Sequence, residues 1–170
     1  MVSANDSLAD TQHQFSELCE LAGKAGMRAA FEFLMITPVR SLAQAIQLVR
    51  GSGHPAAAVL IDTLHLQRCG ATAADVAAVP RELLPYAQLC DGPAHVAGTD
   101  LATYLRDALD ARSAAGEGGL PLADVLRALP GDAPLSLEVR SRRYREQYPD
   151  PVARAAAVLE RTQRFLANLH

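Results

Sequence analysis

The sequence of 170 residues is 49% hydrophobic with a mean hydropathy near zero, so it can bury one sizeable core and is expected to form a single domain. Its net charge of −3 and pI near 5.9 give no general reason to expect nucleic acid or an anionic membrane as a partner. The three cysteines form an odd set without a C-x-x-C spacing, and no signal peptide or long apolar run is seen, which predicts a cytoplasmic protein without disulfides.

Helix-period stretches alternate along the chain with short, continuously apolar runs, a pattern typical of parallel βα units. Residues 1–12 are expected to be disordered. In chain order, the predicted elements are a helix at 13–25, a strand at 27–33, a helix starting at Thr37-Pro38 and ending at Gly51, a strand at 56–62, a short helix capped by Thr72, a strand at 86–90, helices at 99–112 and 122–129, a strand at 134–139 and a helix from 151 to about 169.

A polar residue lies at or near the end of each of the four apolar runs. The carboxyl ends of parallel barrel strands open on one face, where active sites are built. We therefore expect four side chains to converge there: Glu32, Asp62, Gln88 and Glu138. Each of these residues alone is most simply a solvated residue at a strand end. A possible oxygen ligand at the end of four successive strands, however, favours a site.

Three carboxylates at close range repel one another unless they are protonated or bind a cation. An all-oxygen set suits a hard ion, so the pattern predicts one divalent metal, with Mg²⁺ or Mn²⁺ favoured and Co²⁺ or Zn²⁺ as alternatives.

Five segments together resemble a known family. They are FEF at 31–33, VLIDTLH at 59–65, AQLCDGP at 87–93, GEGGLPLADVLRALP at 116–130 and LSLEV at 135–139. Their order and spacing are similar to those of the sugar phosphate isomerase/epimerase-like superfamily of xylose isomerase-like TIM barrels. The resemblance implies one divalent ion held by Glu, Asp, His and Glu of the fifth to eighth strands, which here are Glu32, Asp62, position 88 and Glu138.

Position 88 departs from that pattern because it is Gln. Members that resemble 3-dehydroshikimate dehydratase have Gln there, and they use the His of an Asp-x-x-His motif, matched here by Asp62 and His65. Gln88 therefore favours a dehydratase-like branch. The structural alternative for His65 is a histidine packed at a strand-to-loop junction.

The resemblance also implies an incomplete fold. Full barrels of the family have eight βα units, whereas this sequence predicts an α/β half-barrel of four, equivalent to the fifth to eighth. A natural half-barrel and a truncated fragment both remain open. The edge strands at 27–33 and 134–139 would invite pairing with another chain, so a homo-oligomer or a complex with a second chain is expected.

The predicted function is a metal-dependent lyase or isomerase that acts on a small polyhydroxylated keto compound, a sugar, a sugar phosphate or a keto acid, through an enolate or enediolate. The resemblance implies that a dehydratase would use His65 as the base, whereas an epimerase would relay protons through Glu32 and Glu138. The alternative is a catalytically incomplete barrel fragment that associates with another chain.

Further candidates follow the fourth strand and the glycine-rich loop. Arg140 and Arg142 could bind a substrate carboxylate or phosphate, although a solvated basic loop is the simpler interpretation. Glu117 lies in the GEGG segment and could border the pocket. This segment lacks the Lys-Ser/Thr of a phosphate-binding P-loop, so it is expected to shape a turn.

Overall fold

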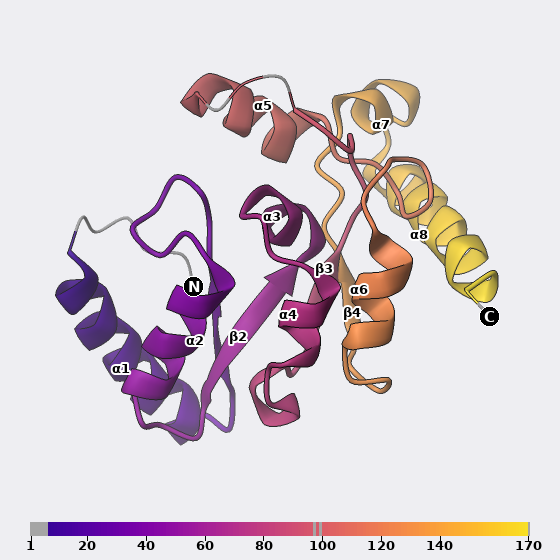
Figure 1. Ribbon diagram of the computed structural model, residues 1–170. Coiled ribbons are helices and arrows are strands. Elements are labelled where there is room, and N and C mark those ends of the chain that lie inside the picture. The colour runs from indigo at the N-terminus through magenta and orange to yellow at the C-terminus, as the bar shows by residue number, and fades with distance from the viewer. Residues whose placement is uncertain (1–6, 97, 99, 170) are drawn as a thin grey trace.

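The computed structural model describes residues 7–96, 98 and 100–169 (Figure 1). Four parallel strands form one sheet in the order of the chain, which confirms the predicted α/β fold built from parallel βα units. The strands are β1 (Ala29–Glu32), β2 (Ala57–Asp62), β3 (Ala87–Leu89) and β4 (Leu135–Leu137).

Helices pack on one face of this sheet and at its two ends (Figure 1). They are α1 (Leu8–Lys24), α2 (Leu42–Gly51), α3 (Thr63–Arg68), α4 (Ala73–Ala77), α5 (Leu101–Asp110), α6 (Leu122–Ala128), α7 (Arg142–Gln147) and α8 (Pro151–Ala167), with a 3₁₀ turn η1 (Arg81–Leu83). Among the described residues, no helix is long and apolar enough to cross a membrane.

The main core lies between the outer face of the sheet and the helices. Every residue of β2 is buried, and Val59 and Ile61 pack in the same cluster as residues of α1 and α2. Phe15 of α1 meets Phe31 of β1 edge to face, with ring centroids 5.4 Å apart. Since side chains alternate along a strand, the even-numbered residues of β1 and β2 face the opposite side, which is the inner face of the sheet.

The strands are staggered as in one half of a closed barrel. Glu32 pairs with the residue two positions before Asp62, and Asp62 pairs directly with Gln88. Gln88 in turn pairs with the residue two positions before Glu138. These offsets amount to four residues, half of the shear of eight that an eight-stranded barrel requires. The four residues therefore lie in one layer across the inner face.

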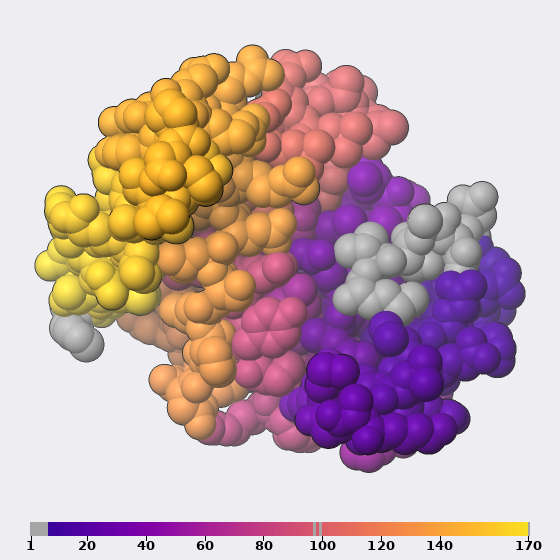
Figure 2. Space-filling view, turned by 180° about the vertical axis from the view of Figure 1, so that it is seen from behind, coloured from indigo at the N-terminus to yellow at the C-terminus, as the bar shows by residue number. Residues whose placement is uncertain are grey.

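The inner face reaches the surface of the molecule. In the view from behind, the segments of β3 and β4 are visible between the helices at the two ends (Figure 2). Ser136 on β4 is exposed, and Tyr86 and Gln88 are half-buried. The described residues thus form the outer wall and the strands of a half-barrel whose inner side remains accessible.

Two helix starts differ from the prediction. Helix α1 begins at Leu8 because the Ser7 hydroxyl accepts the backbone N–H of Asp10, so residues 8–12 form its first turns and are not disordered; residues 1–6 lie outside the described residues. Helix α2 begins after Ser41, which caps it, and not at Thr37-Pro38. Thr37 instead binds backbone carbonyls within the preceding loop.

Two short helices, α3 and α7, were not predicted. Helix α3 follows β2 without a loop because the Asp62 carboxylate accepts the N–H groups of Leu64 and His65, which makes this residue an N-cap. Ser141 caps α7 in the same way. Thr72 caps α4 as predicted, within a reciprocal capping box with Asp75.

Candidate functional site

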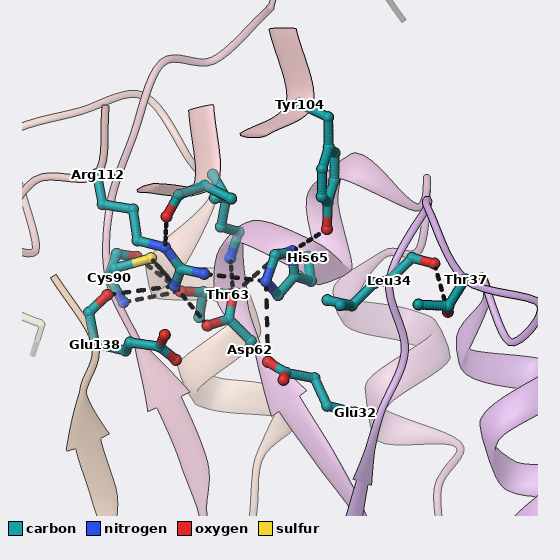
Figure 3. Close-up of polar contacts among 12 residues, drawn as sticks. Glu32, Leu34, Thr37, Asp62, Thr63, His65, Cys90, Tyr104, Arg112 and Glu138 are labelled. Atoms are coloured by element: carbon teal, nitrogen blue, oxygen red, sulfur yellow. Dashed lines mark hydrogen bonds and ion pairs between the residues drawn. The ribbon is translucent and has the colours of Figure 1, made fainter. Parts of the chain in front are cut away.

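Three predicted site residues meet at the carboxyl ends of β1 and β2 (Figure 3). Glu32, Asp62 and His65 each offer a ligand atom within 4.8 Å of the others, and they form a group that could hold a metal ion. The Nε2 atom of His65 lies 3.9 Å from Oε1 of Glu32. His65 reaches this position because α3 starts directly at the end of β2 and carries the ring back over the strand end.

Asp62 is fixed by both of its oxygens. Oδ1 accepts the N–H groups of Leu64 and His65 at 2.9 and 3.0 Å, and Oδ2 accepts a hydrogen bond from the Arg112 guanidinium at 2.6 Å. Its side chain is fully buried. The carboxylate thus caps a helix with one oxygen and pairs with a cation through the other.

Glu32 is held in a setting that opposes its charge. Burial raises the pKa of Glu32 to about 7, and the nearby carboxylates of Asp62 and Glu138 add to this effect. Its Oε1 atom is buried and has no hydrogen-bond partner among the described residues, and the same holds for Oε1 of Gln88. Buried acceptors without a donor are costly, and a bound cation would satisfy them.

The donor set fits a divalent cation. Glu32, Asp62, Gln88 and Glu138 occupy one layer of the inner face, and Figure 3 shows the carboxylates of the three acidic residues gathered around one region. The Arg112 guanidinium contacts the Asp62 carboxylate and interacts electrostatically with those of Glu32 and Glu138. With all three carboxylates ionised and His65 neutral, the charges of these groups sum to −2, which a divalent ion would balance.

Arg112 is the functional residue that the sequence did not reveal. It lies in the loop after α5 and is 2% exposed. Besides Asp62 it donates to the Ala108 carbonyl at 2.9 Å, to Cys90 Sγ and the Glu138 carbonyl at 3.3 Å, and to His65 Nε2 at 3.0 Å. One guanidinium therefore ties the ends of β2, β3 and β4 to α5.

The contact with Arg112 determines the state of His65. A guanidinium only donates, so Nε2 accepts and the ring proton is on Nδ1, which lies 2.8 Å from the Tyr104 hydroxyl. Burial lowers the pKa of His65 to about 4, and Arg112 adds to this shift while Asp62 opposes it. The ring is therefore neutral at pH 7, and its Nε2 lone pair is engaged by Arg112 in this arrangement.

A small pocket of about 180 Å³ opens over these groups. Its polar lining residues are Glu32, His65, Arg112, Glu138 and the predicted substrate-binding residue Arg140. Its apolar lining residues are Leu34, Ile36, Leu105, Ala108 and Leu109, and Tyr104 lines it as well. The pocket could thus hold a small molecule that has both oxygen groups and an apolar part.

Two other predicted substrate-binding residues do not line this pocket. Arg142 is largely exposed and pairs with Asp110 at 3.3 Å. Glu117 accepts hydrogen bonds from Arg143, Tyr144 and Arg161, so it anchors the GEGG loop to α7 and α8. Glu117 was predicted near the site because the loop that carries it precedes β4. Its carboxylate is instead bound by side chains of the last two helices.

The GEGG loop forms a turn, as expected, around the buried carboxylate of Asp91. Asp91 accepts the N–H groups of Gly92, Gly116 and Leu120 at 2.8 to 3.0 Å. A Cβ atom on Gly118 would lie 2.3 Å from the Gly92 carbonyl oxygen, so the close approach requires glycine. The loop supports the segment that carries Arg112.

Comparison with known proteins connects this geometry to a family. The model of the xylose isomerase-like TIM barrel family matches residues 2–168. A xylose isomerase-like TIM barrel/4-hydroxyphenylpyruvate dioxygenase fusion protein is 28% identical, with coverage of 76% of this chain and 21% of that one and a TM-score of 0.67. No curated protein matches the sequence.

Two further solved structures share the fold. The IOLI protein with a bound zinc atom is 14% identical, with 99% of this chain and 60% of that one covered and a TM-score of 0.74. The probable 3-DHS dehydratase AsbF from Bacillus anthracis is 17% identical, with coverage of 98% and 60% and a TM-score of 0.69. The chain therefore spans about 60% of the length of these two structures.

Proposed function

The chain belongs to the xylose isomerase-like TIM barrel family, and we propose that it is a metal-dependent lyase or isomerase acting on a small polyhydroxylated keto compound. The observation that carries this proposal is the layer of oxygen donors at the strand ends, in which Oε1 of Glu32 and Oε1 of Gln88 are buried and have no hydrogen-bond partner among the described residues. The zinc atom in the IOLI structure supports a divalent ion in this fold, and the oxygen-rich donors here favour Mg²⁺ or Mn²⁺ over zinc or cobalt.

The residues that would hold the ion are Glu32, Asp62, Gln88 and Glu138. When bound, a divalent ion polarises a carbonyl oxygen and makes the neighbouring C–H more acidic. Glu32 is suited to accept the proton because a pKa of about 7 lets it both take and release one near neutral pH. Arg140 at the pocket rim would bind a substrate carboxylate.

Gln88 favours a dehydratase over an epimerase. AsbF, a structural neighbour, is named a probable 3-DHS dehydratase. The resemblance drawn from the sequence implies that dehydratases of this kind have Gln at this strand end. In the dehydratase reaction a base removes a proton and a β-hydroxyl then leaves. If His65 is that base, its Nε2 must first lose the hydrogen bond from Arg112. The epimerase alternative needs only Glu32 and Glu138 on opposite sides of the substrate.

The second candidate function is a barrel fragment that works only with another chain, for example a copy of itself. The four-residue stagger supports this alternative because it leaves half of the shear of a closed barrel to be supplied by further strands. The apparent mass of the chain by sedimentation, with and without Mn²⁺, tests it. A monomer that binds Mn²⁺ would contradict this alternative.

Calorimetric titration with Mn²⁺ tests the metal site directly. We expect one ion per chain, with binding lost in Glu138→Ala and Glu32→Gln. Glu160→Ala is the matched control, because this exposed acid on α8 pairs with Arg164 and with no other basic residue of the described part of the chain. A chain that binds no Mn²⁺, or binds it equally well in Glu138→Ala, would contradict the proposal.

A further inference from the structure

A directed series of hydrogen bonds crosses the candidate site. It begins at the buried Arg112 guanidinium, passes through the His65 imidazole and ends at the Tyr104 hydroxyl on α5 (Figure 3). Its direction follows from the donors alone. Arg112 can only donate, so His65 Nε2 accepts; neutral His65 then carries its proton on Nδ1 and donates it to the Tyr104 oxygen.

This direction leaves the Tyr104 proton free. With the Nε2-protonated tautomer of His65, the Tyr104 hydroxyl would donate its proton to Nδ1 and could not donate it to a ligand. Here the oxygen already accepts from Nδ1, and no hydrogen bond donated by the hydroxyl joins it to another described residue. Burial raises the pKa of Tyr104, so the phenol keeps its proton at neutral pH.

Tyr104 belongs to the wall of the pocket. Tyr104 lines the same 180 Å³ space as Glu32, His65, Arg112 and Glu138, and the ring lies stacked on His65 with centroids 5.8 Å apart. Helix α5 is held in place by a second buried contact, the Arg68–Asp107 ion pair at 2.6 Å. The position of the phenol is thus fixed from two sides.

We infer that Tyr104 is a ligand-binding residue that donates a hydrogen bond to a negatively charged oxygen of the molecule in this pocket. The inference rests on the proposed function, in which an enolate oxygen develops beside the carboxylate layer. The cation at the far end of the series polarises each bond in the same sense, which strengthens the last donor. Among the described residues that line this pocket, Tyr104 supplies a neutral donor next to the carboxylates of Glu32 and Glu138.

The tautomer of His65 can be measured without any ligand. Long-range ¹H–¹⁵N NMR of the chain labelled at histidine distinguishes the two neutral forms. We expect the Nδ1-protonated tautomer for His65, whereas Arg112→Met should convert it to the Nε2-protonated form that is usual in solution. An Nε2-protonated His65 in the wild-type chain would overturn the inference, because Tyr104 would then donate to the ring.

The role of the hydroxyl can be measured with oxalate, a small dianion that mimics an enolate, titrated into the chain in the presence of Mn²⁺. Tyr104→Phe keeps the ring and its stacking on His65 but removes the O–H. We expect oxalate binding to weaken about ten- to a hundredfold in this variant, the loss typical of a hydrogen bond to a charged group, with Mn²⁺ affinity unchanged. Tyr148→Phe, at the junction of α7 and α8, is the matched control.

The outcomes separate this inference from the proposed function. If the wild-type chain binds neither Mn²⁺ nor oxalate, the proposed function fails, whatever the tautomer of His65. If the wild-type chain binds both and Tyr104→Phe binds oxalate equally well, the metal site stands and the role of Tyr104 is overturned.

Discussion

Replacing Glu32 by Gln tests whether the acidic layer destabilises the metal-free chain. The pKa of Glu32 is raised from 4.5 to about 7 by burial and by the carboxylates of Asp62 and Glu138. A raised pKa means that the folded state binds more protons than the unfolded state between pH 4.5 and 7. The contribution of Glu32 to the free energy of unfolding therefore falls as pH rises through this window, and Gln should remove that loss.

The magnitude follows from the size of the shift. A change from 4.5 to about 7 corresponds to at most about 3 kcal/mol above pH 7, an upper limit because 15% of the side chain remains exposed. His65 acts in the opposite sense. Its pKa is lowered from 6.5 to about 4, so its contribution to stability rises between pH 4 and 6.5. The pH dependences that Glu32 and His65 give to the free energy of unfolding have opposite signs and largely cancel in the wild-type chain. The effect of one group becomes visible when the other is removed.

Urea unfolding in EDTA at pH 4, 5, 6, 7 and 8 measures both effects. We expect Glu32→Gln to match the wild type near pH 4 and to exceed it at pH 8 by up to about 3 kcal/mol. Its stability should also rise from pH 4 to 6.5, because His65 now acts alone. Glu160→Gln on α8 is the control and should show no pH-dependent difference. The reasoning is refuted if Glu32→Gln is no more stable than the wild type at pH 8.

Three further substitutions probe the framework by thermal and urea unfolding. Arg112→Met leaves the Asp62 carboxylate buried without its cation and should cost about 3 to 5 kcal/mol; a loss below 1 kcal/mol would show that the pair contributes little. Gly118→Ala places a Cβ atom 2.3 Å from a backbone oxygen and should lower the free energy of unfolding by about 1 to 3 kcal/mol. An unchanged midpoint of urea unfolding would contradict the close approach. Arg81→Ala breaks an exposed pair with Asp132 and should leave the urea midpoint unchanged.

The strand ends were predictable because the signals are local. A run such as AAAVLID at 56–62 is apolar throughout because both faces of β2 are covered, and the polar residue that ends it marks the edge of the sheet. The convergence of Asp62 and Gln88 follows from parallel pairing and needs no knowledge of the loops. Helix α3 had a local signal as well, since Asp-Thr-Leu-His is a good helix start, but Asp62 was interpreted only as a metal ligand.

Arg112 and Tyr104 could not be predicted in the same way. Both belong to the segment inserted between β3 and β4, and their contacts with His65 and Asp62 span 39 to 50 residues of the sequence. Arg112 carries no motif, and its side chain enters the site because its backbone N–H binds the carbonyl of Arg140 beyond β4. Such placement depends on the tertiary packing of the loops, which the periodicity of the chain does not encode.

Arg112 raises the question of whether it replaces the proposed ion or coexists with it. A replacement would satisfy the acceptors that the ion would bind. The five acceptors of Arg112 are instead Asp62, His65, Cys90 and the carbonyls of residues 108 and 138, and neither Oε1 of Glu32 nor Oε1 of Gln88 is among them. When all three carboxylates are ionised, one positive charge also leaves two of their charges unbalanced. The guanidinium therefore binds one set of acceptors, and Oε1 of Glu32 and Oε1 of Gln88 are left for a divalent ion.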